Sequence, residues 1–161
     1  MNTKNVILAT IASATIATGI NAAENNVVNK AWEGHKYDDL CYAITFPEKT
    51  KDANAEGNRY VTITNRPSED RRNELAFVSG FPEDYQIDGS VSVDANLPFK
   101  LLTYKGVGFV KSGDIETMLA SQMRAGSKLE VKWTNLDGEY IVDRYSLMGF
   151  TATHKFISKC K

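Results

Sequence analysis

Short runs of alternating apolar and polar residues, separated by turn signals, constrain the fold of this chain most strongly. Residues 90–94 alternate with a period of two, and residues 59–64 are rich in β-branched and aromatic side chains. Both patterns are typical of half-buried strands. Asp137-Gly138 predicts a tight turn between two later strands. The other expected strands lie within residues 42–46, 74–81, 99–104, 107–110, 129–133 and 139–147.

Two segments have helical spacing instead. Apolar residues recur at this spacing from Ile115 to Met123, Asp114 is placed to cap the helix, and Gly126 lies just past its end. Residues 150–160 predict a short helix at the C-terminus. We therefore expect a mainly β fold: an antiparallel β-sandwich of about eight strands, with one mid-chain helix and a short C-terminal helix.

The N-terminal segment differs from the rest of the chain. Lys4 precedes an uncharged apolar run over residues 6–20, and small residues follow at Ala22 and Ala23. This order predicts a secretory signal peptide over residues 1–23. A retained membrane anchor is the less favoured alternative, because the run is shorter than the ~20 residues that span a bilayer. We expect a flexible leader over residues 24–30, then a single domain over residues 31–161 without a transmembrane segment.

Length and charge exclude several classes of protein. A chain of 161 residues suits one domain with a sizeable core. The formal net charge is −1 with both signs scattered, so a nucleic-acid partner is not expected. The sequence indicates no cofactor.

The chain has two cysteines, Cys41 near the start of the expected domain and Cys160 near its end. An oxidising compartment after export would favour a disulfide between them. In the chain-entropy model such a bond would stabilise the fold by at most about 5 kcal/mol. The alternative is a free nucleophilic Cys41 with His35 as its base. Neither His35 nor His154 has the spacing of a metal ligand, so no metal site is predicted.

The most informative polar residues are Asp39, beside Asp38, and the consecutive Asp143, Arg144 and Tyr145. As a functional site they would supply paired carboxylates or an anion-binding arginine. As structural groups they would be a turn carboxylate and charged positions on a half-exposed strand. Alternation would then place Asp143 and Tyr145 on one face and Arg144 on the other. They are candidate binding residues, and no catalytic set is identified.

Several sequence blocks, taken in order, resemble the invasion-associated locus B family. The strongest is Asp-Arg-Tyr-Ser-Leu-Met-Gly-Phe at residues 143–150, followed by the final Cys160. Together the blocks cover the chain from about Trp32 to Cys160. The others are Asp-Asp-Leu-Cys-Tyr-Ala-Ile-Thr at 38–45, Val-Thr-Ile-Thr-Asn-Arg-Pro at 61–67, Asn-Glu at 73–74 leading to Ser-Gly-Phe-Pro at 79–82, Phe-Lys-Leu-Leu-Thr at 99–103 and Met-Arg-Ala-Gly-Ser at 123–127.

The resemblance implies a bacterial, exported protein that is periplasmic or associated with the outer membrane. The founding members are linked to host-cell invasion, and no agreed enzymatic chemistry comes with the family. Asp137 stands where the family usually carries a basic residue before the glycine, which puts any ligand contact of that residue in question here.

The leading hypothesis is a non-enzymatic protein that binds an unknown envelope or protein partner. The alternatives are an exported hydrolase that uses carboxylates, and a carrier of a small lipid or glycan in a pocket between sheets.

Overall fold

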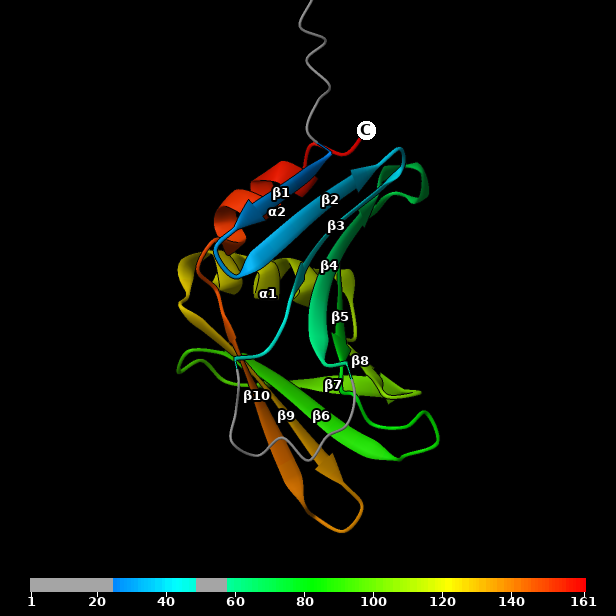
Figure 1. Ribbon diagram of the computed structural model, residues 1–161. Helices are drawn as coiled ribbons and strands as arrows, with labels where there is room; N and C mark the ends of the chain where they lie inside the picture. Colours follow the sequence, from blue (N-terminus) through cyan, green and yellow to red (C-terminus); the bar gives the residue numbers. More distant parts are fainter. Residues whose placement is uncertain (1–24, 49–57) are drawn as a thin grey trace, which may run out of the picture.

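The computed structural model describes residues 25–48 and 58–161 (Figure 1). The signal peptide predicted for residues 1–23 lies outside the described residues. Two α-helices, α1 (Gly113–Ala125) and α2 (Phe150–Ile157), and a short 3₁₀ turn η1 (Pro67–Glu69) accompany the strands. The described residues form the strands β1 (Asn26–Asn29), β2 (Trp32–Tyr37), β3 (Leu40–Thr45), β4 (Tyr60–Arg66), β5 (Arg71–Val78), β6 (Ile87–Val93), β7 (Phe99–Tyr104), β8 (Val107–Phe109), β9 (Lys128–Asn135) and β10 (Tyr140–Ser146).

The strands follow one continuous order, β1-β2-β3-β4-β5-β8-β7-β6-β9-β10, in which all neighbours are antiparallel. The first half of β7 pairs with β6 and its second half pairs with β8. The sheet therefore turns within β7, and Figure 1 shows β6, β9 and β10 crossing below β2 to β5. The expected mainly β, antiparallel fold with two helices is confirmed. In the described ranges there are ten strands rather than about eight, and their order is continuous rather than divided between two sheets.

Strands β1 and β2 are absent from the sequence-based expectation. The segment over residues 24–30, expected as a flexible leader, contains β1, which pairs with β2 from Asn26↔His35 to Asn29↔Trp32. Its Asn-rich composition has low strand propensity. Strand β1 is an edge strand, so it needs a neighbouring strand on one side only. Strand β2 is this neighbour, and its backbone groups pair with those of β1. The prediction of a leader was wrong for these residues.

Two element boundaries also differ from the expectation. Strand β5 begins at Arg71 rather than residue 74, because Asp70 adopts the left-handed conformation (φ 54°) and closes the turn η1 at once. Helix α1 is capped by Ser112, whose hydroxyl accepts a hydrogen bond from the Ile115 amide, and not by Asp114. Its C-cap is Gly126, as expected.

The core is filled around Trp133 of β9. A Cβ atom added to Gly89 of β6 or Gly108 of β8 would lie 2.8 or 2.9 Å from its ring. Because such distances leave no room for a side chain, the two glycines let both strands approach the indole closely. Leu101 of β7 contacts the same two positions. Trp133 therefore packs the interior at the bend of the sheet.

Hydrogen bonds tie the beginning of the fold to its end. Trp32 of β2 donates its indole N–H to the Ser146 carbonyl at 2.9 Å. The Glu48 amide donates to the Arg144 carbonyl of β10 at 2.7 Å. The segment after β3 thus lies beside β10, although these strands occupy distant places in the strand order.

Candidate functional site

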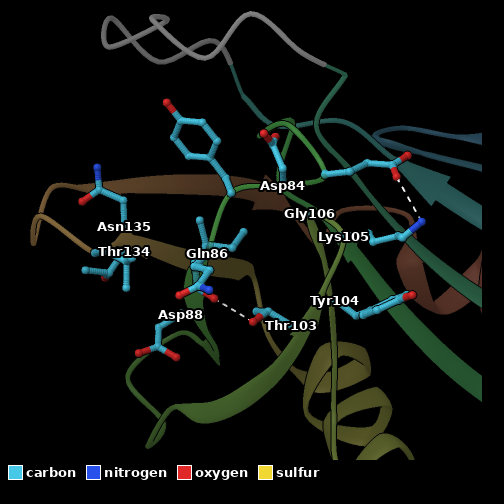
Figure 2. A pocket seen from close by; sticks show the side chains of 13 residues that line it. Asp84, Gln86, Asp88, Thr103, Tyr104, Lys105, Gly106, Thr134 and Asn135 are labelled. Carbon is cyan, nitrogen blue, oxygen red and sulfur yellow. Dashed lines mark hydrogen bonds and ion pairs between the residues drawn. The ribbon is translucent and has the colours of Figure 1, made fainter.

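A groove of about 400 Å³ opens at the bend of the sheet (Figure 2). It is bordered by the segment that leads into β6, by the β7–β8 turn and by the β9–β10 turn. The lining residues are Glu83, Asp84, Tyr85, Gln86, Ile87, Asp88, Thr103, Tyr104, Lys105, Gly106, Thr134, Asn135 and Leu136.

The β7–β8 turn fixes one wall of the groove. Lys105 and Gly106 both have positive φ, 49° and 75°, which suits the two central residues of a tight hairpin turn. The Gly106 carbonyl accepts hydrogen bonds from the amide and the hydroxyl of buried Ser79, at 3.0 and 2.7 Å. The Ser79 hydroxyl also accepts from the Phe81 amide. These bonds hold the segment that leads into β6 against the turn.

The β9–β10 turn forms the opposite wall. Asn135 and Glu139 are joined by backbone and side-chain hydrogen bonds, among them Asn135 Nδ2 to a Glu139 carboxylate oxygen at 3.1 Å. Gly138 has a φ of 83°, in agreement with the turn predicted at Asp137-Gly138. The turn therefore presents Thr134 and Asn135 to the groove on a constrained backbone.

Some polar side chains of the groove are in ion pairs and others have no partner among the described residues. Lys105 lies 3.4 Å from Glu83, and Asp88 lies 3.7 Å from Lys100 at the rim. Asp84 and Gln86 are exposed and have no hydrogen-bond or ion-pair partner among the described residues. A carboxylate and an amide in this state can accept and donate hydrogen bonds to a polar ligand without breaking existing contacts.

The predicted candidate Asp143 lies in the core, away from any solvent. Its side chain is fully buried, and it pairs with Arg59 at 2.5 Å and with the Trp133 indole N–H at 3.2 Å. Burial raises the pKa of the Asp143 carboxyl above its ordinary value, while Arg59 and the Trp133 hydrogen bond act in the opposite direction. Strand β10 is half-exposed, as expected, and Asp143 lies on its buried face, where it is paired with Arg59.

Tyr145 and Arg144 occupy the two faces of β10, as the alternation predicts. Tyr145 is 1% exposed, and burial followed by the nearby Asp143 charge raises the pKa of its phenol. Arg144 is exposed and forms an ion pair with Glu130 at 2.9 Å. Neither residue lines the groove.

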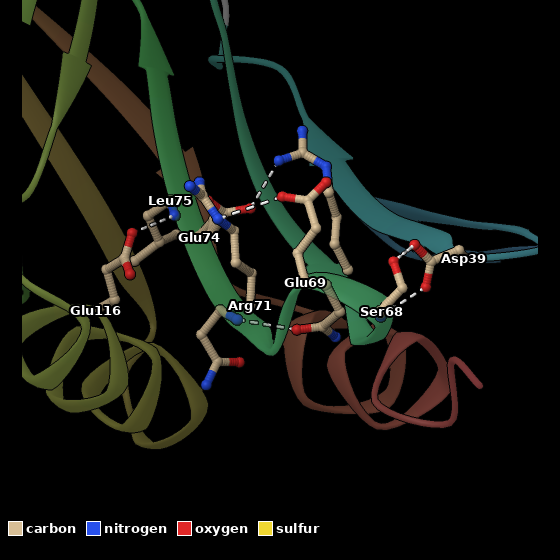
Figure 3. A network of polar contacts seen from close by, with 10 residues as sticks. Asp39, Ser68, Glu69, Arg71, Glu74, Leu75 and Glu116 are labelled. Atoms are coloured by element: carbon tan, nitrogen blue, oxygen red, sulfur yellow. Dashed lines mark hydrogen bonds and ion pairs between the residues drawn. The ribbon is translucent and has the colours of Figure 1, made fainter.

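Asp39 is part of a surface turn contact (Figure 3). It accepts hydrogen bonds from the amide of Ser68, at 2.8 Å, and from the Ser68 hydroxyl. These bonds lower the pKa of the Asp39 carboxyl. Asp39 precedes β3, whereas Arg59, the partner of Asp143, lies beside the other end of that strand. The structure therefore does not bring Asp39 and Asp143 together.

A second polar network, which sequence reasoning missed, joins β5 to α1 (Figure 3). Glu74 accepts from Arg71 at 2.6 Å and from Arg66 at 3.0 Å. The Glu116 carboxylate of α1 accepts from the Leu75 amide at 3.1 Å. Burial is the main cause that raises the pKa of Glu116. The sequence does not reveal this network, because its residues come from three elements that meet only in the folded chain.

The cysteines and histidines have structural partners. Cys41 and Cys160 form a disulfide with a Cα–Cα distance of 5.8 Å. This bond excludes Cys41 as a thiol nucleophile with His35. His35 Nδ1 lies 2.8 Å from Asn26 Oδ1, and His154 is hydrogen-bonded to Asn73. Within the described ranges, no three His, Cys, Asp or Glu residues are arranged to hold a metal ion.

Comparisons with known proteins give one structural relationship. No model of a protein family matches the chain, and no curated protein matches its sequence. The crystal structure of invasion associated protein B from Bartonella henselae matches with a TM-score of 0.54 and 15% sequence identity, over 83% of this chain and 95% of that chain. This chain shares that protein's fold. The resemblance read from the sequence blocks is thus supported as a distant structural relationship.

In the part of the chain that the structure describes, no helix is long and apolar enough to cross a membrane.

Proposed function

We propose that this protein is exported to the periplasm and acts there by binding a polar ligand of the cell envelope, without catalysing a reaction. The fold shared with invasion associated protein B supports the resemblance to the invasion-associated locus B family, and that resemblance implies an exported protein of the cell envelope. The Cys41–Cys160 disulfide suits an oxidising compartment. The N-terminal sequence adds the layout of a signal peptide.

The observation that carries the binding role is the groove with its free polar groups. Asp84 and Gln86 lie between two walls held by backbone hydrogen bonds, and both are without partners in the described ranges. A site with fixed walls and a few available donors and acceptors suits recognition of a hydroxyl-rich ligand. Envelope glycans have this chemistry.

The two alternatives receive less support. A hydrolase that uses Asp39 and Asp143 would need both carboxylates at one substrate, and they lie near opposite ends of β3. A lipid carrier would need an apolar cavity between the sheet layers, and Trp133 fills the space between Gly89 and Gly108.

Export can be tested by the intact mass of the protein from a periplasmic extract, alkylated with and without prior reduction. We expect a chain that begins near Glu24 and takes up alkylating reagent only after reduction. Recovery of the full-length chain in the cytosolic fraction would exclude an exported protein.

Binding can be tested by calorimetric titration with soluble peptidoglycan and lipopolysaccharide-core fragments. Asp84→Asn and Gln86→Ala should each weaken binding roughly tenfold, as expected for loss of one hydrogen bond to a ligand. Asp114→Asn, at an exposed position on α1, is the matched control and should bind as the wild type does. The groove is the wrong site if no fragment binds, or if both groove variants bind normally.

A further inference from the structure

A hollow of about 350 Å³ beside the Cys41–Cys160 disulfide is lined by three lysines. Lys36 comes from β2, and Lys159 and Lys161 come from the residues that follow α2. Figure 1 shows the C-terminus beside the end of β2, where these two segments meet. We call this site the lysine hollow, after Lys36, Lys159 and Lys161.

The disulfide holds the lysine-bearing segments together. Lys36 is opposite Cys41 in the register of β2 and β3, and Cys160 stands between Lys159 and Lys161 in the sequence. One covalent bond, with a Cα–Cα distance of 5.8 Å, therefore fixes the two segments beside each other. Both cysteines line the hollow and are buried. The positions from which the lysines extend are thus set by the covalent structure of the fold.

The positive charges of the hollow are not neutralised by carboxylates of the described residues. In these ranges none of the three lysines forms an ion pair, and Asp38, the acidic residue of the lining, forms none either. The whole chain has a formal net charge of −1. The excess of positive charge is therefore local, and it comes from how the fold brings distant lysines together.

An aromatic contact positions the Lys36 ammonium group. Its Nζ lies 4.1 Å from the centroid of the Phe156 ring, which is a cation–π distance. Among the described residues, no oxygen accepts a hydrogen bond from this ammonium. Burial, followed by the charge of Lys159, lowers the pKa of Lys36. An anion in the hollow would accept hydrogen bonds from Lys36 and would offset its repulsion by Lys159.

The end of α2 does not by itself account for this cluster. The C-terminus of a helix favours cations within its last turn. Lys155 already lies in the last turn of α2, whereas Lys36 belongs to another element. The lysines of the hollow therefore supply more positive charge than the helix end requires.

We propose that the lysine hollow binds a phosphate group, with the ammonium groups of Lys36 and Lys159 as its main donors. A phosphate ester carries between one and two negative charges near neutral pH and has three strong acceptor oxygens, so several ammonium groups can share it. A carboxylate offers one charge and two oxygens. The site is distinct from the groove of the proposed function, because no residue lines both.

Nuclear magnetic resonance titration of the natively processed, oxidised protein tests the site, with inorganic phosphate and then glycerol 1-phosphate at constant ionic strength. We expect saturable shifts of amide signals concentrated in residues 36–41 and 159–161. Lys36→Gln and Lys159→Gln should each weaken binding roughly tenfold, as expected for loss of one charge-assisted hydrogen bond. Lys36→Arg keeps the charge and should bind nearly as the wild type does.

Two control variants show whether binding belongs to this hollow. Lys111→Gln makes the same change of charge at an exposed position between β8 and α1 and should bind normally. Asp84→Asn in the groove should also bind phosphate normally, so that failure of the groove and failure of this site are told apart. The proposal is overturned by the absence of saturable shifts. It is equally overturned if both glutamine variants of the hollow bind normally, or if Lys111→Gln loses as much affinity as they do.

Vesicles distinguish two sources of the phosphate group. Sedimentation of the protein with phosphatidylcholine vesicles that contain phosphatidylglycerol, and its loss in Lys36→Gln, would assign a lipid headgroup. Binding of glycerol 1-phosphate without sedimentation on these vesicles would assign a soluble phosphate ester. Both results require the same lysines.

Discussion

Asp143 shows how one residue can have a role that its sequence neighbours do not reveal. The alternation along β10 predicts that Asp143 and Tyr145 share a face, and both are buried. The alternation cannot predict that Arg59 is the ion-pair partner of Asp143, because Arg59 lies 84 positions away in the sequence. A buried carboxylate requires a partner in space, and a partner in space is not visible in a local pattern.

Replacing Asp143 by asparagine tests this buried pair. Asp143→Asn keeps the shape of the side chain but leaves the Arg59 guanidinium, 9% exposed, without a counter-charge. We expect the free energy of unfolding to fall by about 3 kcal/mol. Urea unfolding at neutral pH, followed by tryptophan fluorescence, would measure the loss.

Arg144→Gln on the same strand is the control for Asp143→Asn. It removes the exposed Arg144–Glu130 pair, which should cost less than about 1 kcal/mol because water screens it. Equal losses in the two variants would mean that the Arg59–Asp143 pair contributes no more than a surface pair does.

At the scale of elements, long alternating runs were predicted well and polar edges were not. Strand β7 has the expected bounds, and β9 and β10 include most of the residues assigned to them. Strand β1 was missed because its stability comes from pairing with β2 and from contacts with α2, rather than from its own Asn-rich sequence. Tertiary context commonly overrides propensity in this way.

The contact between β1 and α2 depends on Gly149. Its φ is 92°, and an added Cβ would lie 1.8 Å from the Asn29 carbonyl oxygen, a backbone atom that cannot rotate away. Gly149→Ala should therefore lower the free energy of unfolding by more than about 4 kcal/mol, as expected for a backbone clash added to left-handed strain. Urea unfolding would measure the loss, and faster hydrogen exchange over residues 26–29 would locate it.

Gly138→Ala separates the clash from the strain. Gly138 also has a positive φ, 83°, but an added Cβ would meet nothing within 4 Å. This variant should lose only about 1 to 2 kcal/mol, the ordinary cost of a left-handed alanine. If both alanine variants lost the same amount, the close approach of Gly149 to β1 would not be limiting.

At the scale of the whole molecule, the sequence predicts the class of fold and the covalent closure but not the surfaces. The turn signals, the alternation and the cysteine pair each depend on residues that a reader of the chain can identify. The groove combines three segments, and the rows of apolar side chains that face away from the core on β4, β5, β8 and β7 depend on the register of these four strands. Exposed apolar residues such as Leu102 look like core residues in the sequence, because alternation does not say which face is covered.

The disulfide is the contact that closes the molecule, since it joins β3 to the residues after α2 across a separation of 119 positions. Closing so long a loop restricts the unfolded chain, so loss of the bond should lower the free energy of unfolding by up to about 5 kcal/mol. Many domains have only about 5 to 15 kcal/mol in total. The C41S/C160S variant should therefore unfold at much lower urea concentration than the oxidised wild type.

The wild type itself supplies the matched control for this variant. In reductant, the wild type should have nearly the same unfolding midpoint as C41S/C160S, because both lack the closed loop. The thiols of the reduced wild type are alkylated after unfolding. If oxidised and reduced wild type unfolded at the same urea concentration, the bond would not stabilise the fold. If only the serine variant were destabilised, the cause would be packing around Cys41, which is buried, rather than loop closure.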